Sequence, residues 1–219
     1  RFNQAIVITI ELSIISLIAA TIIGIIVGLV NTSKSKSLIM KILKAIANLY
    51  IYIIRGTPML VQILIIYFGL GQMLRPTGFR WLNIGGTFTA GTVALSLNAG
   101  AYMAEIVRGG IEAVDKGQIE AARSLGLTYG KTMKKIVLPQ ALRTMLPSII
   151  NQFIISIKDT SLLSVIGLTE LTNVGKTIAA TQSAHMMVIY CFMACYYLFI
   201  CTVLAQVSKV VEKRLSYGK

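Results

Sequence analysis

Polar side chains that could do chemistry occur in two groups inside otherwise apolar stretches of this sequence. Asn98, Tyr102 and Glu105 follow one another at spacings of four and three residues, which would place them on one face of a helix. The second group, in the stretch that reads "NQFIISIKDTSLLSVIG", is Lys158, Asp159 and Ser161. A charged side chain at the centre of a membrane costs roughly 2.5–3.5 kcal/mol, so we expect both groups to serve a purpose.

Two interpretations of these polar groups stay open. They could line a polar path, in which carboxylates accept from a cationic group while Lys158, Asn98 and Ser161 donate to an anionic one. Alternatively they are structural, and Glu105 pairs with Lys158 or packs against another subunit. Lys158 and Asp159 are about 100° apart on a helix, so they cannot both point the same way. We also expect the helix to loosen at "KDTS", where hydroxyls compete for backbone hydrogen bonds.

The other reactive side chains form no catalytic or metal-binding pattern. Cys191, Cys195 and Cys201 share one apolar stretch without a histidine at ligand spacing, so we expect small core residues. The sequence has no His-Glu-x-x-His motif. In "GLTYGKT", three residues separate Gly126 from Gly130, where a phosphate-binding loop has four. We therefore expect this chain to be no enzyme and to bind neither a metal nor ATP itself.

The composition indicates which elements must position these side chains. The 219 residues are 55% hydrophobic and 13% charged, with a mean hydropathy of +0.75, whereas soluble domains carry about 25% charged residues. Stretches near the roughly 20 apolar residues that cross a bilayer recur and must be helical there. We predict an all-α polytopic membrane protein, one domain over residues 1–219, with five transmembrane helices. The predicted spans cover about 5–30, 57–73, 87–107, 142–165 and 186–207.

Short patterns refine these spans. The stretch "LIMKILKAIANLYIYIIRGTP" is predicted to be an amphipathic entry to span two. In its "RGTP", Arg55 is expected at the cytoplasmic headgroups, Thr57 as a cap and Pro58 at the first helical turn. Gly24 and Gly28 predict tight packing of the first span against another helix. The first apolar run is too long for a signal peptide and has no basic leader, so we expect none.

The charge distribution predicts the orientation of the chain. The formal net charge is +13, and most of the 21 Lys and Arg residues fall between spans one and two, between spans three and four, and after span five. Short cytoplasmic loops carry such an excess, so we predict an outside N-terminus and a cytoplasmic C-terminus. Because orientation explains the basic residues, we expect no nucleic-acid partner.

The longest cytoplasmic loop, about residues 108–141, contains "GQIEAARSLGLTYGKTMKKIVLP". We expect Gly117 to break the preceding chain, a short helix to follow, and Gly126 to end it. A second short helix would begin at Thr128 and stop before Pro139. The loop is thus predicted to fold as two short helices.

The first of these helices carries small apolar side chains. Ala121, Ala122 and Leu125 fall at helical spacing and predict one shallow apolar face. Such a face suits a helix that enters a groove on another protein. It equally suits a surface helix that lies on the core of its own chain, and both interpretations stay open.

The residues of this loop resemble a family pattern. Glu120-Ala121-Ala122, then Gly126, and then Ile136-x-Leu138-Pro139 resemble the EAA loop of permease subunits from bacterial ATP-binding-cassette importers. The stretches "RGTPMLVQ", "AYMAEIVRGGIEAV" and "KDTSLLSVIG" resemble the polar amino-acid branch of that family. Together they cover most of the chain from the second predicted span onward.

The resemblance implies the ABC importer permease fold and a set of partners. The loop would be the coupling helix that docks on a separate ATPase. The implied docking residues are Glu120, Ala121, Ala122, Arg123, Leu125 and Gly126. The implied partners are two ATP-binding-cassette ATPase subunits, a second permease chain (identical or a paralogue), and an extracytoplasmic binding protein, all at the bacterial inner membrane. ATP and Mg would be held by the ATPase, and this chain would hold no cofactor.

The function implied by the resemblance is ATP-driven uptake of a polar L-amino acid, a class that includes the basic ones. Its path through the membrane would use the two polar groups described first: Asn98, Tyr102, Glu105, Lys158, Asp159 and Ser161. The alternative is a self-sufficient secondary carrier or channel for small polar solutes. The chain shows no internal duplication, which fits poorly with carriers built from repeats.

Overall fold

A computed structural model of the chain describes residues 2–216, and within them all regular structure is helical. The long helices are α1 (Phe2–Thr32), α2 (Leu38–Gly56), α5 (Gly86–Glu112), α8 (Leu138–Asp159) and α10 (Met186–Ser216). The shorter α-helices are α3 (Met59–Leu64), α4 (Gly71–Met73), α6 (Lys116–Ser124), α7 (Tyr129–Thr132) and α9 (Leu171–Thr181). The π-helical segments are η1 (Ile65–Leu70) and η4 (Met133–Val137). The 3₁₀ segments are η2 (Arg75–Thr77), η3 (Trp81–Ile84), η5 (Thr160–Ile166) and η6 (Ser183–His185).

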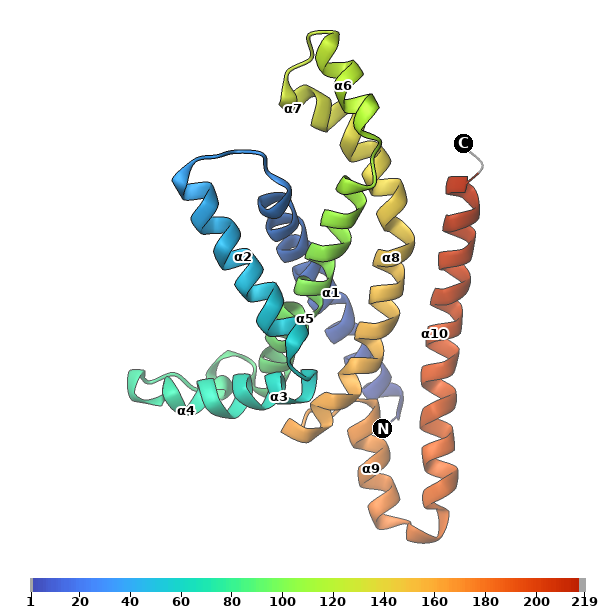
Figure 1. The fold of residues 1–219 in the computed structure, drawn as a ribbon. Helices are drawn as coiled ribbons and strands as arrows, with labels where there is room; N and C mark the ends of the chain where they lie inside the picture. Colours follow the sequence, from blue (N-terminus) through green and yellow to red (C-terminus); the bar gives the residue numbers. More distant parts are fainter. Residues whose placement is uncertain (1, 217–219) are drawn as a thin grey trace.

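The molecule is an elongated bundle with two distinct ends (Figure 1). One end, which we call the α6 end, carries α6, α7 and the C-terminal end of α10. The opposite end, the α9 end, carries α9 and the turn into α10. Among the described residues, three helical stretches are long and apolar enough to cross a membrane: Phe2–Thr32, Tyr129–Ile166 and Met186–Arg214. A bent pair, Leu38–Gly56 with Met59–Met73, would give a fourth.

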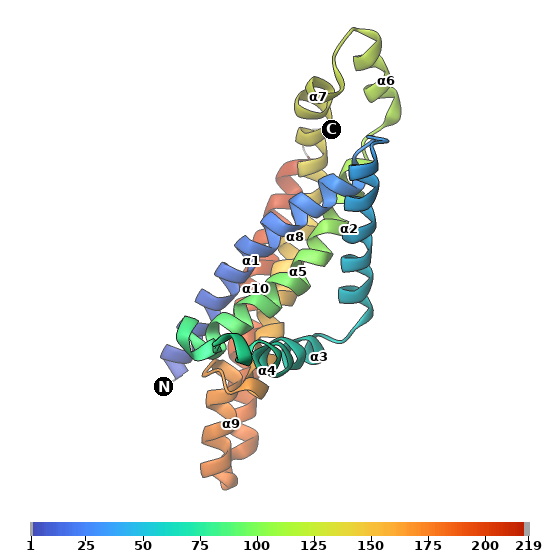
Figure 2. The same cartoon turned by 90° about the vertical axis from the view of Figure 1, so that its left-hand side faces the viewer.

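The 27-residue helix α5 occupies the centre of the bundle and contacts α1, α2 and α8. It runs beside α1 in Figure 2. The two helices approach closely because Gly24 and Gly28 face Met103 and Val107. A Cβ on Gly24 would collide with the Cβ of Met103, and one on Gly28 would lie 2.7 Å from that of Val107. This confirms the predicted tight packing of the first span.

The second predicted span, at 57–73, is wrong in its bounds. The straight helix at this place is α2, which the sequence had suggested as a mere entry stretch, and the chain then bends by 110° into α3, η1 and α4. Thr57 is extended (φ −122°, ψ 146°), as expected for a residue before proline, and Pro58 caps α3. The proline therefore forms a corner between two helices instead of starting a straight span.

The expected position of Arg55 at the cytoplasmic headgroups stays a prediction. Arg55 is exposed and lies in the last turn of α2, which begins near the α6 end. It does not lie beside Lys34 and Lys36, which precede α2.

The prediction that Pro139 ends a second short helix is also wrong. Helical structure continues from Tyr129 through η4 into α8, and Pro139 occupies the first turn of α8. A proline lacks an N–H and its ring clashes with the carbonyl four residues earlier in a regular α-helix. The wider π turn at Met133–Val137 accommodates it, so the loop joins the long helix without a break.

Candidate functional site

Helix α6 begins at a side-chain cap that the sequence prediction missed. The carboxylate of Asp115 accepts a hydrogen bond from the backbone N–H of Gln118 at 3.2 Å. Gly117 lies within the first turn and does not break the chain there, contrary to the prediction. The sequence signal was present, because Asp115-x-x-Gln118 has the spacing of a capping box.

The end of α6 is set by Gly126, as predicted. Gly126 has φ +82°, in the left-handed region that favours glycine. The N–H of Leu127 donates to the carbonyl of Ala122 (3.2 Å), and the N–H of Gly126 donates to that of Arg123 (3.0 Å). This is the Schellman arrangement, which satisfies carbonyls that a helix end leaves unpaired. The Arg123 guanidinium also donates to the carbonyl of Leu127 at 2.8 Å.

The two alanines of the EAA pattern face opposite directions. Ala122 is buried, at 3% exposure, on the side of α6 that packs on α7 and η4. Glu120 and Ala121 are exposed, and Leu125 is 84% exposed. The prediction of one face shared by Ala121, Ala122 and Leu125 is therefore wrong, since neighbouring residues lie about 100° apart on a helix. One side of the helix packs on its own chain, as one interpretation expected, and the other side is open, so docking on another protein stays a prediction.

Helix α6 contacts the long helices through two side chains. Gln140 on α8 donates its amide N–H to the side-chain oxygen of Gln118 at 2.6 Å. Ile119 packs on a core cluster built from α5, η4 and α8, which includes Ile111, Val137 and Ala141. These contacts link α6 to the ends of α5 and α8.

Asn98 is buried in a contact between α5 and Gln62, and it does not line an open groove. Its amide N–H donates to the side-chain oxygen of Gln62 at 2.9 Å. The Gln62 amide nitrogen in turn donates to the carbonyls of Ile54 (2.7 Å) and Thr57 (3.0 Å) at the end of α2. Gln62 and Asn98 thus tie α5 to the corner between α2 and α3. Gln62 was not predicted to be a site residue, although it is the last residue of the stretch "RGTPMLVQ".

Tyr102 and Glu105 line an open groove of about 580 Å³ between α2, α5, α8 and α10. Other polar groups in its lining are Arg55, Ser148, Asn151, Gln152, Ser208 and Glu212. The groove combines donors, acceptors and an aromatic ring, so it could hold a small zwitterion.

Glu105, which lines this groove, forms ion pairs with two arginines. Arg55 Nη1 lies 2.8 Å from Glu105 Oε2, and its guanidinium lies 5.5 Å from the centre of the Tyr102 ring. Arg108 Nε lies 3.0 Å from Glu105 Oε1, and Arg108 Nη1 lies 3.1 Å from Glu112 Oε2. The structural alternative that paired Glu105 with Lys158 is therefore wrong, because two arginines already neutralise Glu105.

The second predicted polar group lies apart from this groove. Lys158 and Asp159 end α8, and Ser161 lies in η5, where its hydroxyl donates to the carbonyl of Lys158 at 2.7 Å. The change from α-helix to 3₁₀ at Thr160 confirms the predicted loosening at "KDTS". None of Lys158, Asp159 and Ser161 lines the groove with Tyr102 and Glu105. This groove therefore contains Tyr102 and Glu105 of the first predicted group and none of the second, and a path that uses both groups stays a prediction.

A buried carboxylate at the start of α9 was missed. Glu170 is completely buried and accepts hydrogen bonds from the backbone N–H groups of Thr172 and Asn173, both at 2.7 Å. The Tyr197 hydroxyl donates to it at 3.2 Å. Burial raises the pKa of the Glu170 carboxyl above its ordinary value, although the two backbone amides oppose the shift. Glu170 thus joins α9 to α10.

Comparison with known proteins places these features in context. Residues 20–217 match the model of a family described as binding-protein-dependent transport system inner membrane component. The chain is 40% identical over 207 residues to the glutamine transport system permease protein GlnP of Escherichia coli K12, covering 94% of this chain and 89% of the relative. It is 37% identical over 212 residues to the arginine transport system permease protein ArtQ of Bacillus subtilis, covering 97% and 91%.

A solved structure is similar over nearly the whole chain. It is described as the crystal structure of an amino acid ABC transporter with histidines. The TM-score is 0.85 at 35% sequence identity, covering 97% of this chain and 93% of the other.

Proposed function

The chain belongs to the family of binding-protein-dependent transport system inner membrane components, and from that membership we propose how it works. It is a membrane permease subunit of an amino-acid uptake system of the bacterial inner membrane, and it is not itself an enzyme. Proteins of this family work with an ATPase and a substrate-binding protein. A self-sufficient carrier is accordingly not favoured.

We propose that two copies of this chain, or this chain and a paralogue, assemble with two ATPase subunits that hold the ATP and Mg. The α6 end would face the cytoplasm and the α9 end the outside, as the basic residues suggest. The five crossings would be α1, α2, α5, α8 and α10. Helix α5 is not among the three helical stretches that are long and apolar enough to cross a membrane, but it lies at the centre of the bundle, where α1, α2 and α8 contact it.

The observation that supports this proposal is that one side of α6 is buried against its own chain while the other side is exposed. Its outward side would present the exposed Glu120, Ala121 and Leu125 to the ATPase, while its inward side contacts α8 through Gln118 and the core cluster of α5, η4 and α8 through Ile119. Movement of the ATPase would then move α5 and α8 together. Both helices line the groove that contains Tyr102 and Glu105, so movement of the ATPase would change the shape of this groove. Arg123 and Gly126 would hold the shape of the docking element.

We propose that a polar or basic amino acid passes through this groove, in line with the glutamine and arginine named for the two relatives. Tyr102 and Glu105 would contact it, and a cationic substrate would compete with Arg55 for Glu105. Asn98 would position α5 without contacting substrate. Lys158, Asp159 and Ser161 would form a separate polar position nearer the α9 end.

Reconstituted vesicles test the proposal. The chain, its ATPase and its binding protein are purified together, and uptake of labelled glutamine and arginine is measured. We expect uptake to require ATP on the side of the membrane where the ATPase is bound. Collapsing the ion gradients across the membrane should leave uptake unchanged. Uptake driven by an ion gradient in vesicles without the ATPase would contradict the proposal.

A further inference from the structure

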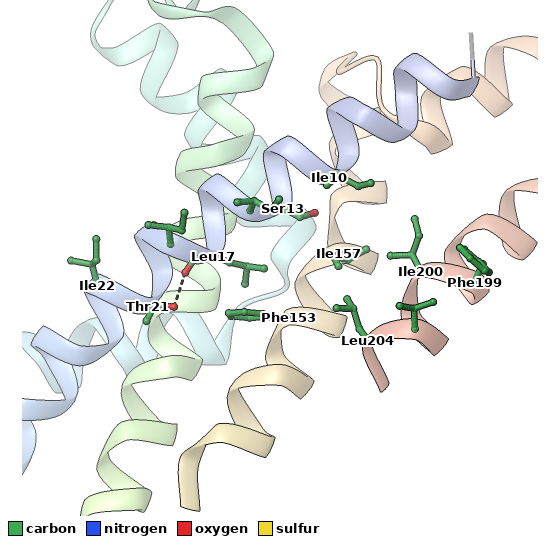
Figure 3. A pocket seen from close by; sticks show the side chains of 13 residues that line it. Ile10, Ser13, Leu17, Thr21, Ile22, Phe153, Ile157, Phe199, Ile200 and Leu204 are labelled. Carbon is green, nitrogen blue, oxygen red and sulfur yellow. Dashed lines mark hydrogen bonds between the residues drawn. The ribbon is translucent and has the colours of Figure 1, made fainter. Parts of the chain in front are cut away.

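A second groove lies between α1, α8 and α10 and has a volume of about 600 Å³ (Figure 3). Ile157 of α8 and Ile200 and Leu204 of α10 point into it from one side, and Leu17 of α1 lies across from them. The groove is separate from the one that contains Tyr102 and Glu105, since no residue lines both.

The groove offers nothing to a polar ligand. Its only hydroxyls belong to Ser13 and Thr21, and each already donates to a carbonyl of its own helix, Thr9 at 2.7 Å and Leu17 at 2.7 Å. The rest of the lining is aliphatic or aromatic. A transported amino acid would lose its hydration there without replacement, so the occupant must be apolar.

Two arginines lie beyond the groove toward the α6 end. Arg214 follows Val203 of the lining by three helical turns on the same face of α10, about 16 Å farther along the axis. Arg143 precedes Phe153 of the lining on α8 by about 15 Å. Among residues 2–216, neither guanidinium has an ion-pair partner. Each arginine thus lies about 15–16 Å along its helix from the groove lining, which is half of the roughly 30 Å thickness of the hydrocarbon core of a bilayer.

We propose that the groove between α1, α8 and α10 binds one acyl chain of an anionic phospholipid, with its phosphate at Arg143 and Arg214. The apolar lining accommodates the chain, and the two positive charges match the headgroup. The phospholipid belongs to the leaflet at the α6 end, an assignment that uses only the proposed orientation of the chain. It fills the space that separates α10 from α1, since α10 packs on α8 and α9.

Lipid retention tests the proposal independently of transport. The complete transporter is extracted from nanodiscs of equimolar phosphatidylglycerol and phosphatidylethanolamine, and the retained lipids are counted by native mass spectrometry. We expect the wild type to retain phosphatidylglycerol preferentially. Arg143→Gln and Arg214→Gln should each lower that preference by about fivefold. Lys36→Gln, which removes a charge at the same end away from the groove, should leave it unchanged.

A second pair of variants addresses the acyl chain. Val203→Phe narrows the groove and should abolish retention of both lipids, whereas Leu198→Phe, on another face of α10, should not. An unchanged lipid preference in both arginine variants, or full retention in Val203→Phe, would overturn the proposal. So would a disulfide between one copy carrying Val203→Cys and another carrying Ile14→Cys, in a background without native cysteines, since a second copy would then occupy the groove.

Discussion

At the scale of single residues, Gly126 determines where α6 ends. Its φ of +82° is costly for any residue with a Cβ, by about 1–2 kcal/mol. We expect Gly126→Ala to lower ATP-driven uptake and the thermal stability of the chain. Gly130 is a matched control, since its φ is not positive and a Cβ there meets no atom within 4 Å. Equal uptake and equal melting temperatures for Gly126→Ala and Gly130→Ala would show that the turn is unimportant.

Ala121 and Ala122 allow docking and folding to be separated. Ala122→Leu forces three additional carbons into a buried contact and should destabilise the chain by about 1–3 kcal/mol. Ala121→Leu places the same side chain in solvent and should leave stability unchanged while weakening association with the ATPase. Thermal unfolding of the isolated chain and co-purification with the ATPase measure the two effects. If Ala121→Leu retained the ATPase fully, the outward side of α6 would not be the docking face.

The buried carboxyl of Glu170 should make the stability of the start of α9 depend on pH. Because burial raises its pKa in the folded chain, folding favours the protonated carboxyl. The stability that this contributes is complete below the unfolded pKa, and it is lost as the pH rises through the raised folded pKa. We expect the amides of Thr172 and Asn173 to lose hydrogen-exchange protection as the pH rises, after correction for intrinsic rates.

The variant Glu170→Gln is the informative control for this prediction. A neutral amide oxygen still accepts from both backbone N–H groups, so protection should persist and become independent of pH. Glu170→Ala should lose protection at every pH. A pH dependence that survived in Glu170→Gln would assign the titration to another group.

At the scale of elements, the corner between α2 and α3 depends on one glutamine. Gln62 is buried at 6% exposure, and its side chain bonds two carbonyls, the Thr57 hydroxyl and Asn98. Gln62→Ala leaves these groups unpaired and should destabilise the chain by about 2 kcal/mol, measured by thermal unfolding. Gln72→Ala, at an exposed position of α4, should have no effect. Equal melting temperatures for the two variants would mean that water replaces the Gln62 side chain.

The elements also explain how α6 can transmit a movement. A short helix on a flexible loop would absorb a displacement, whereas α6 is capped at Asp115, closed at Gly126 and bonded to α8 through Gln140. The continuous helix from Tyr129 into α8 removes the second flexible joint. The π turn that Pro139 requires is thus compatible with a stiff connection.

At the scale of the whole molecule, the seam between α1 and α5 holds the bundle together. Gly24→Ala introduces a Cβ against the Cβ and backbone carbonyl carbon of Met103, so the helices must separate along their length. We expect a loss of about 1–3 kcal/mol in stability and a reduced yield of assembled transporter. Gly56→Ala, where a Cβ meets nothing within 4 Å, is the matched control. Normal assembly of Gly24→Ala would show that α1 and α5 can move apart without loss of the fold.

Much of this architecture follows from the sequence alone. Composition and basic-residue distribution indicated a helical membrane protein, and the EAA loop with "KDTSLLSVIG" indicated the importer family. The end of α6 at Gly126, the tight seam at Gly24 and Gly28, and the loosening after Asp159 were all predicted correctly. These features depend on composition or on residues within a few turns of each other, so their signal lies within one stretch of chain.

Only the tertiary structure decided which polar groups meet. Glu105 pairs with Arg55, fifty residues away, because the corner at Pro58 directs α2 toward α5, and no local spacing contains that information. Asn98 is satisfied by Gln62 for the same reason, while Lys158 lies nearer the α9 end of α8 and does not line the groove. Ala122 is buried and Ala121 is not, since the path of α7 and η4 selects one face of α6. Local sequence determines which helices form, but the free energy of burying and pairing their side chains depends on neighbours that packing alone provides.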